Sequence, residues 1–142
     1  MPGERLPLEL RTGLRAGSVF YFQSRELTSA EPHFFVVVNS DPIRAELLLL
    51  TIVTSNLADV RTRNRTRMQT VVEITPSEYA EFTLHSAIDC NSVFEKPLSE
   101  LAGMVMRKEV RYHRDLPPKI FAKIRAAVLA SPVIPDELKE ML

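Results

Sequence analysis

The sequence predicts a mainly β domain with C-terminal helices, folded as a small and strongly curved barrel. Two observations predict this class. About five short runs rich in β-branched and aromatic residues follow one another from residue 17 to residue 95, with turn residues between them. One long helical pattern occurs, and it lies near the C-terminus. A chain of 142 residues can bury one substantial core, so we expect a single barrel domain over residues 17–142. Residues 1–16 are expected to form an N-terminal arm.

The first half of the chain contains three of the expected strands. Residues 1–16 are predicted to form an arm or a short helix. Residues 18–22 are dense in strand formers and precede a polar loop. Residues 33–39 form a continuous apolar run, which is typical of a strand buried on both faces. The apolar run over residues 46–54 could be helical, but its β-branched end and neighbouring turns favour a strand.

Two further strand regions lie in the middle of the chain. Residues 69–74 predict a strand, and residues 86–95 predict two short strands or one bent strand that Pro97 limits. Between them, Thr75 is expected to cap a helix that has proline at its first position and Glu78 completing a capping box.

The C-terminal helix is predicted to begin at Pro118. Its apolar positions Ile120, Ile124 and Val128 recur every four residues. Ser131 and the following proline end it, and Pro135 begins a last short helix.

Composition narrows the class of protein. The 18 basic and 18 acidic residues give a formal net charge of zero. We find no apolar run of the ~18–20 residues that a membrane helix needs and no secretory signal, so we expect no membrane association and a cytoplasmic location. The single cysteine, Cys90, excludes an internal disulfide framework and is expected to be a small buried hydrophobe.

A basic run, RTRNRTR, interrupts this neutral composition between the third and fourth expected strands. It contains Arg61, Arg63, Arg65 and Arg67, which would share one face of an extended chain. These guanidinium groups could bind the phosphates of RNA. The run could equally be a solvated loop, a charged edge strand that resists aggregation, or a surface for an acidic partner peptide.

Four landmarks follow in a recognisable order: Gly17–Phe22, His33–Asp41, Thr51–Asn56, and Thr70–Ile74 with the short helix and the strand Ser86–Cys90 that are expected after it. This succession, over roughly residues 16–101, resembles the MazF/PemK family of toxin endoribonucleases. The resemblance implies an SH3-like barrel with added helices, a homodimer, and an antitoxin protein as partner.

The resemblance also implies an activity, the cleavage of single-stranded RNA without a metal or cofactor, leaving a cyclic phosphate. The catalytic threonine of the family falls on Thr54. The family's arginine position falls on His33, which could act as a general acid or base but would not supply a permanent bidentate charge. Arg25, earlier in the same loop, is the other candidate for that charge. The alternative is an inactive barrel that binds RNA or a partner protein.

The remaining polar residues give weaker signals. His33, His85 and His113 are scattered without metal-ligand spacing, so no metal site is expected. A second basic stretch, residues 107–114, contains Glu109 and is followed by Asp115, which favours a solvated face.

Overall fold

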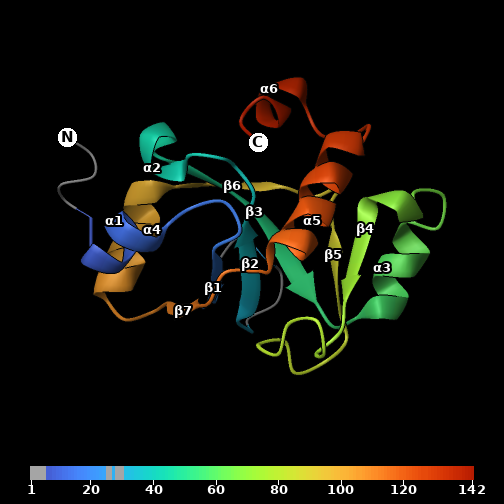
Figure 1. Ribbon diagram of the computed structural model, residues 1–142, viewed down its shortest axis with the longest axis horizontal. Helices are drawn as coiled ribbons and strands as arrows, with labels where there is room; N and C mark the ends of the chain where they lie inside the picture. The colour runs from blue at the N-terminus through green and yellow to red at the C-terminus, as the bar shows by residue number, and fades with distance from the viewer. Residues whose placement is uncertain (1–5, 25–26, 28–30) are drawn as a thin grey trace.

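The computed structural model describes residues 6–24, 27 and 31–142. One seven-stranded antiparallel sheet forms its centre, and its strands run in the order β4-β5-β3-β2-β1-β7, with β6 pairing with β3 (Figure 1). The strands are β1 (Val19–Phe22), β2 (His33–Val37), β3 (Leu47–Thr54), β4 (Val71–Ile74), β5 (Ser86–Asp89), β6 (Phe94–Pro97) and β7 (Arg111–His113). The mainly β class is therefore confirmed.

Helices lie around this sheet. In Figure 1, α5 lies across one face, α1, α2 and α4 gather at one end, and α3 lies beside β4 at the other. The helices are α1 (Leu8–Gly13), α2 (Pro42–Ala45), α3 (Leu57–Arg63), the 3-10 helix η2 (Met68–Thr70), α4 (Leu98–Met106), α5 (Pro118–Ala130) and α6 (Asp136–Lys139). Within the described part of the chain, none is long and apolar enough to cross a membrane.

The sheet buries a separate apolar cluster on each face. Successive residues of a strand point to opposite faces, so the long apolar runs supply both clusters. On one face, Val36 and Leu49 pack in a cluster with Ile124 of α5. On the other face, Phe35 and Leu50 pack in a cluster with Leu10 of α1, Leu101 of α4 and their neighbours. This second face also carries the candidate functional residues.

Most of the elements expected from the sequence are present. All the expected strands form, α5 begins at Pro118, and α6 follows Pro135 as its N-cap. The helix expected after Thr75 is wrong, because residues 76–78 form a turn. The predicted acid still caps this turn, since Glu78 Oε1 accepts a hydrogen bond from the Thr75 amide at 3.0 Å. Burial of Tyr79 and Phe82 in the core then directs the chain away from a helical path.

Candidate functional site

The strand register places His33 beside Thr54. Phe34 of β2 pairs with Val53 of β3, so the next position along the ladder sets His33 opposite Thr54. Residues directly opposite each other on antiparallel strands project to the same face, with Cα atoms about 4.5–5.5 Å apart. Phe22 of β1 pairs with His33 on its other side. Phe22, His33 and Thr54 therefore form one row across three strands, which we call the catalytic row because it contains two of the residues predicted to be catalytic.

Local hydrogen bonds hold the Thr54 side chain at the end of β3. Its Oγ1 accepts a hydrogen bond from the Asn56 amide at 3.1 Å. The Asn56 side chain in turn caps α3, accepting from the Asp59 amide at 3.2 Å. Because a threonine hydroxyl can donate as well as accept, the Thr54 proton remains able to bond an oxygen of a ligand. Arg25, the third predicted catalytic residue, lies outside the described residues.

The RTRNRTR segment joins β3 to β4 as expected, but it is not extended. Arg61 and Arg63 belong to helix α3, so the four arginines do not share the face that an extended chain would give them. The Arg61 guanidinium forms two bonds with Glu73 of β4, at 3.0 and 2.6 Å. Arg63 contacts Asp59 at 2.7 Å and Asp89 of β5 at 3.3 Å. These two arginines therefore tie α3 to the sheet.

The asparagine at the centre of this segment is buried. Asn64 donates hydrogen bonds to the Val60 carbonyl at 3.0 Å and to Asp89 Oδ2 at 3.1 Å. Its own oxygen accepts from Asn91 at 3.1 Å, and Ser131, which follows α5, donates to Asn91 at 2.7 Å. This buried polar cluster links α3, β5 and the end of α5. Burial opposes ionisation of Asp89, but the hydrogen bonds from Asn91 and Asn64 outweigh it and lower its pKa below the ordinary value of 3.8.

The second half of the segment differs from the first in its partners. Arg65 is exposed and Arg67 is half-buried, and neither forms an ion pair with an acidic side chain among the residues that the structure describes. The four arginines thus divide into two that are neutralised by acids and two that are available to a ligand. Their role in RNA binding stays a prediction.

Glu73 also contacts a histidine that the sequence did not single out as functional. His85 Nε2 lies 3.1 Å from Glu73 Oε1, and the hydrogen bonds from Arg61 are the main cause that lowers the pKa of Glu73. Arg61, Glu73 and His85 come from three separate segments. No local spacing pattern signals such a cluster. The pairing of β4 with β5 brings Glu73 and His85 together, and the packing of α3 beside the sheet adds Arg61.

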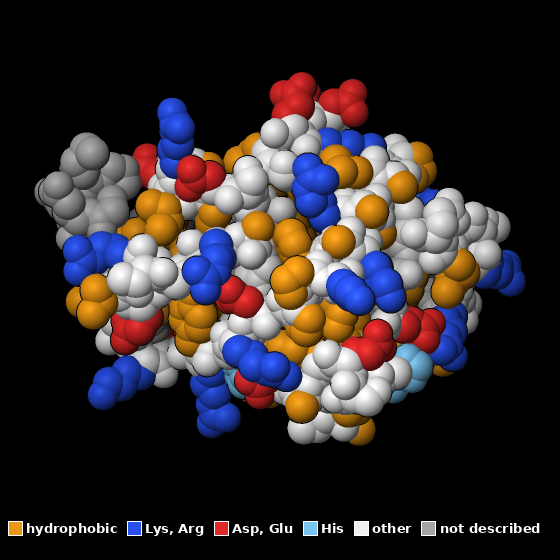
Figure 2. All heavy atoms as spheres, in the orientation of Figure 1, with side chains coloured by type: hydrophobic (Ala, Val, Ile, Leu, Met, Phe, Trp, Pro, Cys, Tyr) orange, Lys and Arg blue, Asp and Glu red, His pale blue; other side chains and the backbone are white. Residues whose placement is uncertain are grey.

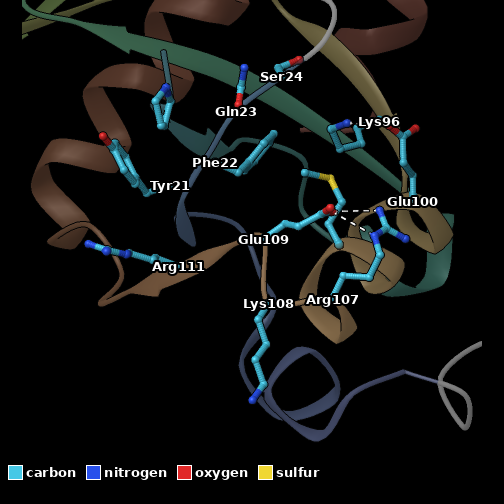
Figure 3. Close-up of a pocket in the computed structure, with 12 residues that line it drawn as sticks. Tyr21, Phe22, Gln23, Ser24, Lys96, Glu100, Arg107, Lys108, Glu109 and Arg111 are labelled. Atoms are coloured by element: carbon cyan, nitrogen blue, oxygen red, sulfur yellow. Dashed lines mark hydrogen bonds and ion pairs between the residues drawn. The ribbon is translucent and has the colours of Figure 1, made fainter. Parts of the chain in front are cut away.

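A pocket of about 1040 Å³ opens beside the catalytic row (Figure 3). Phe22 and Pro32 line one side of it, which places it next to His33. Lys96 of β6 lines another side; it is 4 % exposed, bonds Glu100 at 2.9 Å, and lies 5.4 Å from the centre of the Phe22 ring. The segment after α4 completes the wall. That segment was expected to be a solvated face; it is exposed, and it also lines the pocket.

The turn that closes this pocket has an unusual backbone. Lys108 has φ +60°, a left-handed conformation in which glycine is the usual residue at a helix end. Its amide donates to the Val105 carbonyl at 3.0 Å, and the Glu109 amide donates to the Met104 carbonyl at 2.9 Å. The turn brings Arg107 and Glu109 together, with Nε to Oε2 at 3.0 Å.

The other reactive side chains carry no site. Cys90 is completely buried, as predicted, and burial raises the pKa of its thiol to about 12. Across residues 6–24, 27 and 31–142, no three His, Cys, Asp or Glu side chains are clustered as metal ligands. Basic side chains on the face shown in Figure 2 are spread among acidic and apolar ones rather than gathered in one patch.

No protein-family model matches the chain, and no curated protein sequence is significantly similar to it. Solved structures are similar in fold. An endoribonuclease in complex with its cognate antitoxin from a mycobacterial species aligns with TM-score 0.55 and 13% identity, over 87% of this chain and 98% of that one. MazF in a MazE–MazF complex from Deinococcus radiodurans gives TM-score 0.52 and 12% identity, over 81% and 92% of the two chains.

The toxin MazF-mt6 of Mycobacterium tuberculosis aligns with TM-score 0.51 and 10% identity, over 78% of this chain and 91% of that one. Each of these matches extends over more than three quarters of this chain. The chain therefore has the fold of the MazF toxins.

Proposed function

We propose that this protein is a toxin-type endoribonuclease that cleaves single-stranded RNA without a metal, with His33 and Thr54 at the scissile phosphate. The observation that carries the proposal is the register of β2 and β3, which sets these two side chains side by side on one face of the sheet. The similar structures support it, since those named above are an endoribonuclease and MazF toxins.

In this reaction the ribose 2′-oxygen attacks the adjacent phosphorus in line. The bond from phosphorus to the 5′-oxygen breaks, leaving a 2′,3′-cyclic phosphate and a free 5′-hydroxyl. His33 accepts the proton of the attacking hydroxyl, and the Thr54 hydroxyl donates a hydrogen bond to a non-bridging oxygen. A proton from solvent completes the leaving hydroxyl. The protein contributes mainly by holding the reacting groups in position.

The same fold supports a proposal about partners. Two of the similar structures contain an antitoxin, one as a cognate complex and one as MazE bound to MazF. By analogy, we propose that this chain forms a homodimer and binds an antitoxin protein in the cytoplasm. Fold similarity is the warrant for this step.

The test is incubation of the purified protein with a randomised single-stranded RNA pool in excess EDTA. We expect cleavage products that end in a cyclic phosphate. Thr54→Ala should slow cleavage about 100-fold, because a hydrogen bond to the phosphate would be lost. Thr62→Ala, an exposed threonine of α3, is the matched control and should leave the rate unchanged. Equal cleavage by wild type and Thr54→Ala would refute the role of Thr54.

A second candidate function is RNA or protein binding without cleavage. The observation that favours it is His33 at the position where the family has arginine, since a neutral imidazole does not neutralise a phosphate as a guanidinium does. In that case the wild type binds RNA without cutting it. His33→Arg is the discriminating variant: gain of cleavage would show that the missing arginine alone had silenced the site.

A further inference from the structure

We infer that the pocket beside the catalytic row is a base-binding subsite for a nucleotide next to the scissile phosphate, selecting bases with an exocyclic amino group. The inference rests on the proposed function, because it takes RNA as the ligand. The pocket is formed by the end of β1, by β6, and by the segment from α4 to β7. It requires neither the RTRNRTR segment nor the buried polar cluster.

The position of the pocket suits a neighbouring nucleotide. Phe22 lines the pocket and is also the cross-strand partner of His33. Pro32, which precedes His33, lines it as well. A strand of RNA whose phosphate lies at His33 and Thr54 therefore has this hollow beside the adjoining base.

The pocket lining combines apolar side chains with two pairs of oppositely charged side chains. Phe22 lies beneath the pocket, 1 % exposed and with its ring centre 4.3 Å from that of Phe35, and the partly buried Met104 of α4 supplies apolar surface in the lining. The two ion pairs, Lys96 with Glu100 and Arg107 with Glu109, provide both donors and acceptors. A base needs this combination, since it presents flat apolar faces and an edge of donors and acceptors. In a pure phosphate site all the cations of the lining would be unpaired, whereas two of the four here, Lys96 and Arg107, are paired with acids.

In Figure 3 the charged side chains that follow α4 point in different directions. The Arg107 and Glu109 side chains meet each other, whereas Lys108 and Arg111 point away from this pair. Neither Lys108 nor Arg111 forms an ion pair with an acid among the described residues. These two cations at the rim can contact the phosphates of a bound strand while its base lies inside.

The carboxylate of Glu109 gives the subsite its preference. Its Oε2 accepts both contacts from Arg107, and its Oε1 has no hydrogen bond within the described part of the chain. A free carboxylate oxygen accepts from an amino group, which cytosine presents at N4. Uracil presents the acceptor O4 at the same place, and two acceptors facing each other repel. Cytosine should therefore bind better than uracil.

The test measures binding, so its result does not depend on cleavage. Fluorescently labelled 2′-O-methyl hexanucleotides, one all cytosine and one all uracil, are titrated with wild type, Glu109→Gln and Glu95→Gln while anisotropy is followed. The 2′-O-methyl group prevents attack on the phosphate. Wild type should bind the cytosine probe about tenfold more tightly, the ratio expected for one charge-assisted hydrogen bond.

Glu109→Gln should reduce this ratio to about twofold or less, because the amide can rotate to donate to uracil O4. Glu95→Gln removes the same charge from the exposed residue before Lys96, on the opposite face of β6, and should keep the wild-type ratio. Thermal unfolding of each variant verifies folding. Equal affinity for both probes, no binding of either, or an unchanged ratio in Glu109→Gln would overturn the inference. Binding with this preference but without cleavage of unmodified RNA would reject only the enzymatic proposal.

Discussion

Residues 61–67 and residues 107–114 are the two basic segments of this neutral chain, and the fold uses them differently. The first has four arginines and no acid, whereas the second has four Lys or Arg side chains and Glu109. By charge alone, the first segment would be expected to bind nucleic acid more tightly than the second. In the structure, however, Arg61 and Arg63 bind acids of the sheet and of α3, and Asn64 is buried with Asp89.

In the second segment an acid interrupts the basic residues, but the segment lines a pocket. Its acid does not cancel its function in our scheme, because Glu109 supplies the acceptor that a base requires. The partners of a charged side chain therefore decide its role. Some of these partners come from distant parts of the chain. Arg63 and Asp89 are 26 positions apart, and Phe22 and Arg107 lie on different elements of one pocket wall.

The largest effect should follow from removing the acid that anchors the first segment. Asp89→Ala is expected to lower the free energy of unfolding by about 3 kcal/mol, because Arg63, Asn64 and Asn91 lose a buried charged partner. Denaturant unfolding at pH 7 measures this. Asp59→Ala removes the exposed partner of Arg63 and should cost less than about 1 kcal/mol.

The same variant has a signature in pH. The folded pKa of Asp89 lies below its ordinary value of 3.8, so its charge stabilises the fold at neutral pH, and this contribution is lost as pH falls below that value. The stability gap between wild type and Asp89→Ala should be constant down to about pH 5 and shrink at lower pH. A gap that stayed constant to pH 3 would show that the charge of Asp89 does not matter.

A smaller effect is expected from the free arginines of the first segment. The double variant Arg65→Ala with Arg67→Ala should weaken binding of single-stranded RNA about fivefold at low salt and reduce the salt slope by about 1.4. Lys119→Ala with Lys123→Ala, on α5, removes the same charge and serves as the control. If the salt dependence of RNA binding were unchanged in the arginine variant, the segment would have a structural role and no role in RNA binding.

The smallest effect concerns the strained turn of the second segment. Lys108→Gly should raise the free energy of unfolding by about 1 kcal/mol, since glycine adopts the left-handed conformation without a steric cost. Lys119→Gly, placed in the first turn of α5, should instead lower it by about 1 kcal/mol. A destabilised Lys108→Gly variant would mean that the Lys108 side chain itself supports the turn.

Much of the fold could be predicted because its signals are local. The apolar runs of β2 and β3, the proline at the start of α5 and the four-residue spacing of its buried positions all act within a few residues. The juxtaposition of His33 and Thr54 was expected only from the resemblance, and the register of the strands supports it. Helices α2, α3 and α4 and strand β7 were missed, and the turn after Thr75 was taken for a helix. Contacts with distant residues decide these segments, as in the pairing of β7 with β1.

The sequence by itself determined the mainly β class, the order of the strands along the chain and the place of the arginine segment between β3 and β4. Hydrophobic periodicity and turn chemistry operate over neighbouring residues, so they can be read from one chain. Only the tertiary structure decided which arginines are neutralised, which acid is buried, and that β1, β6 and the end of α4 enclose a pocket. Ion pairs and pockets depend on distances between segments, and strand pairing sets those distances.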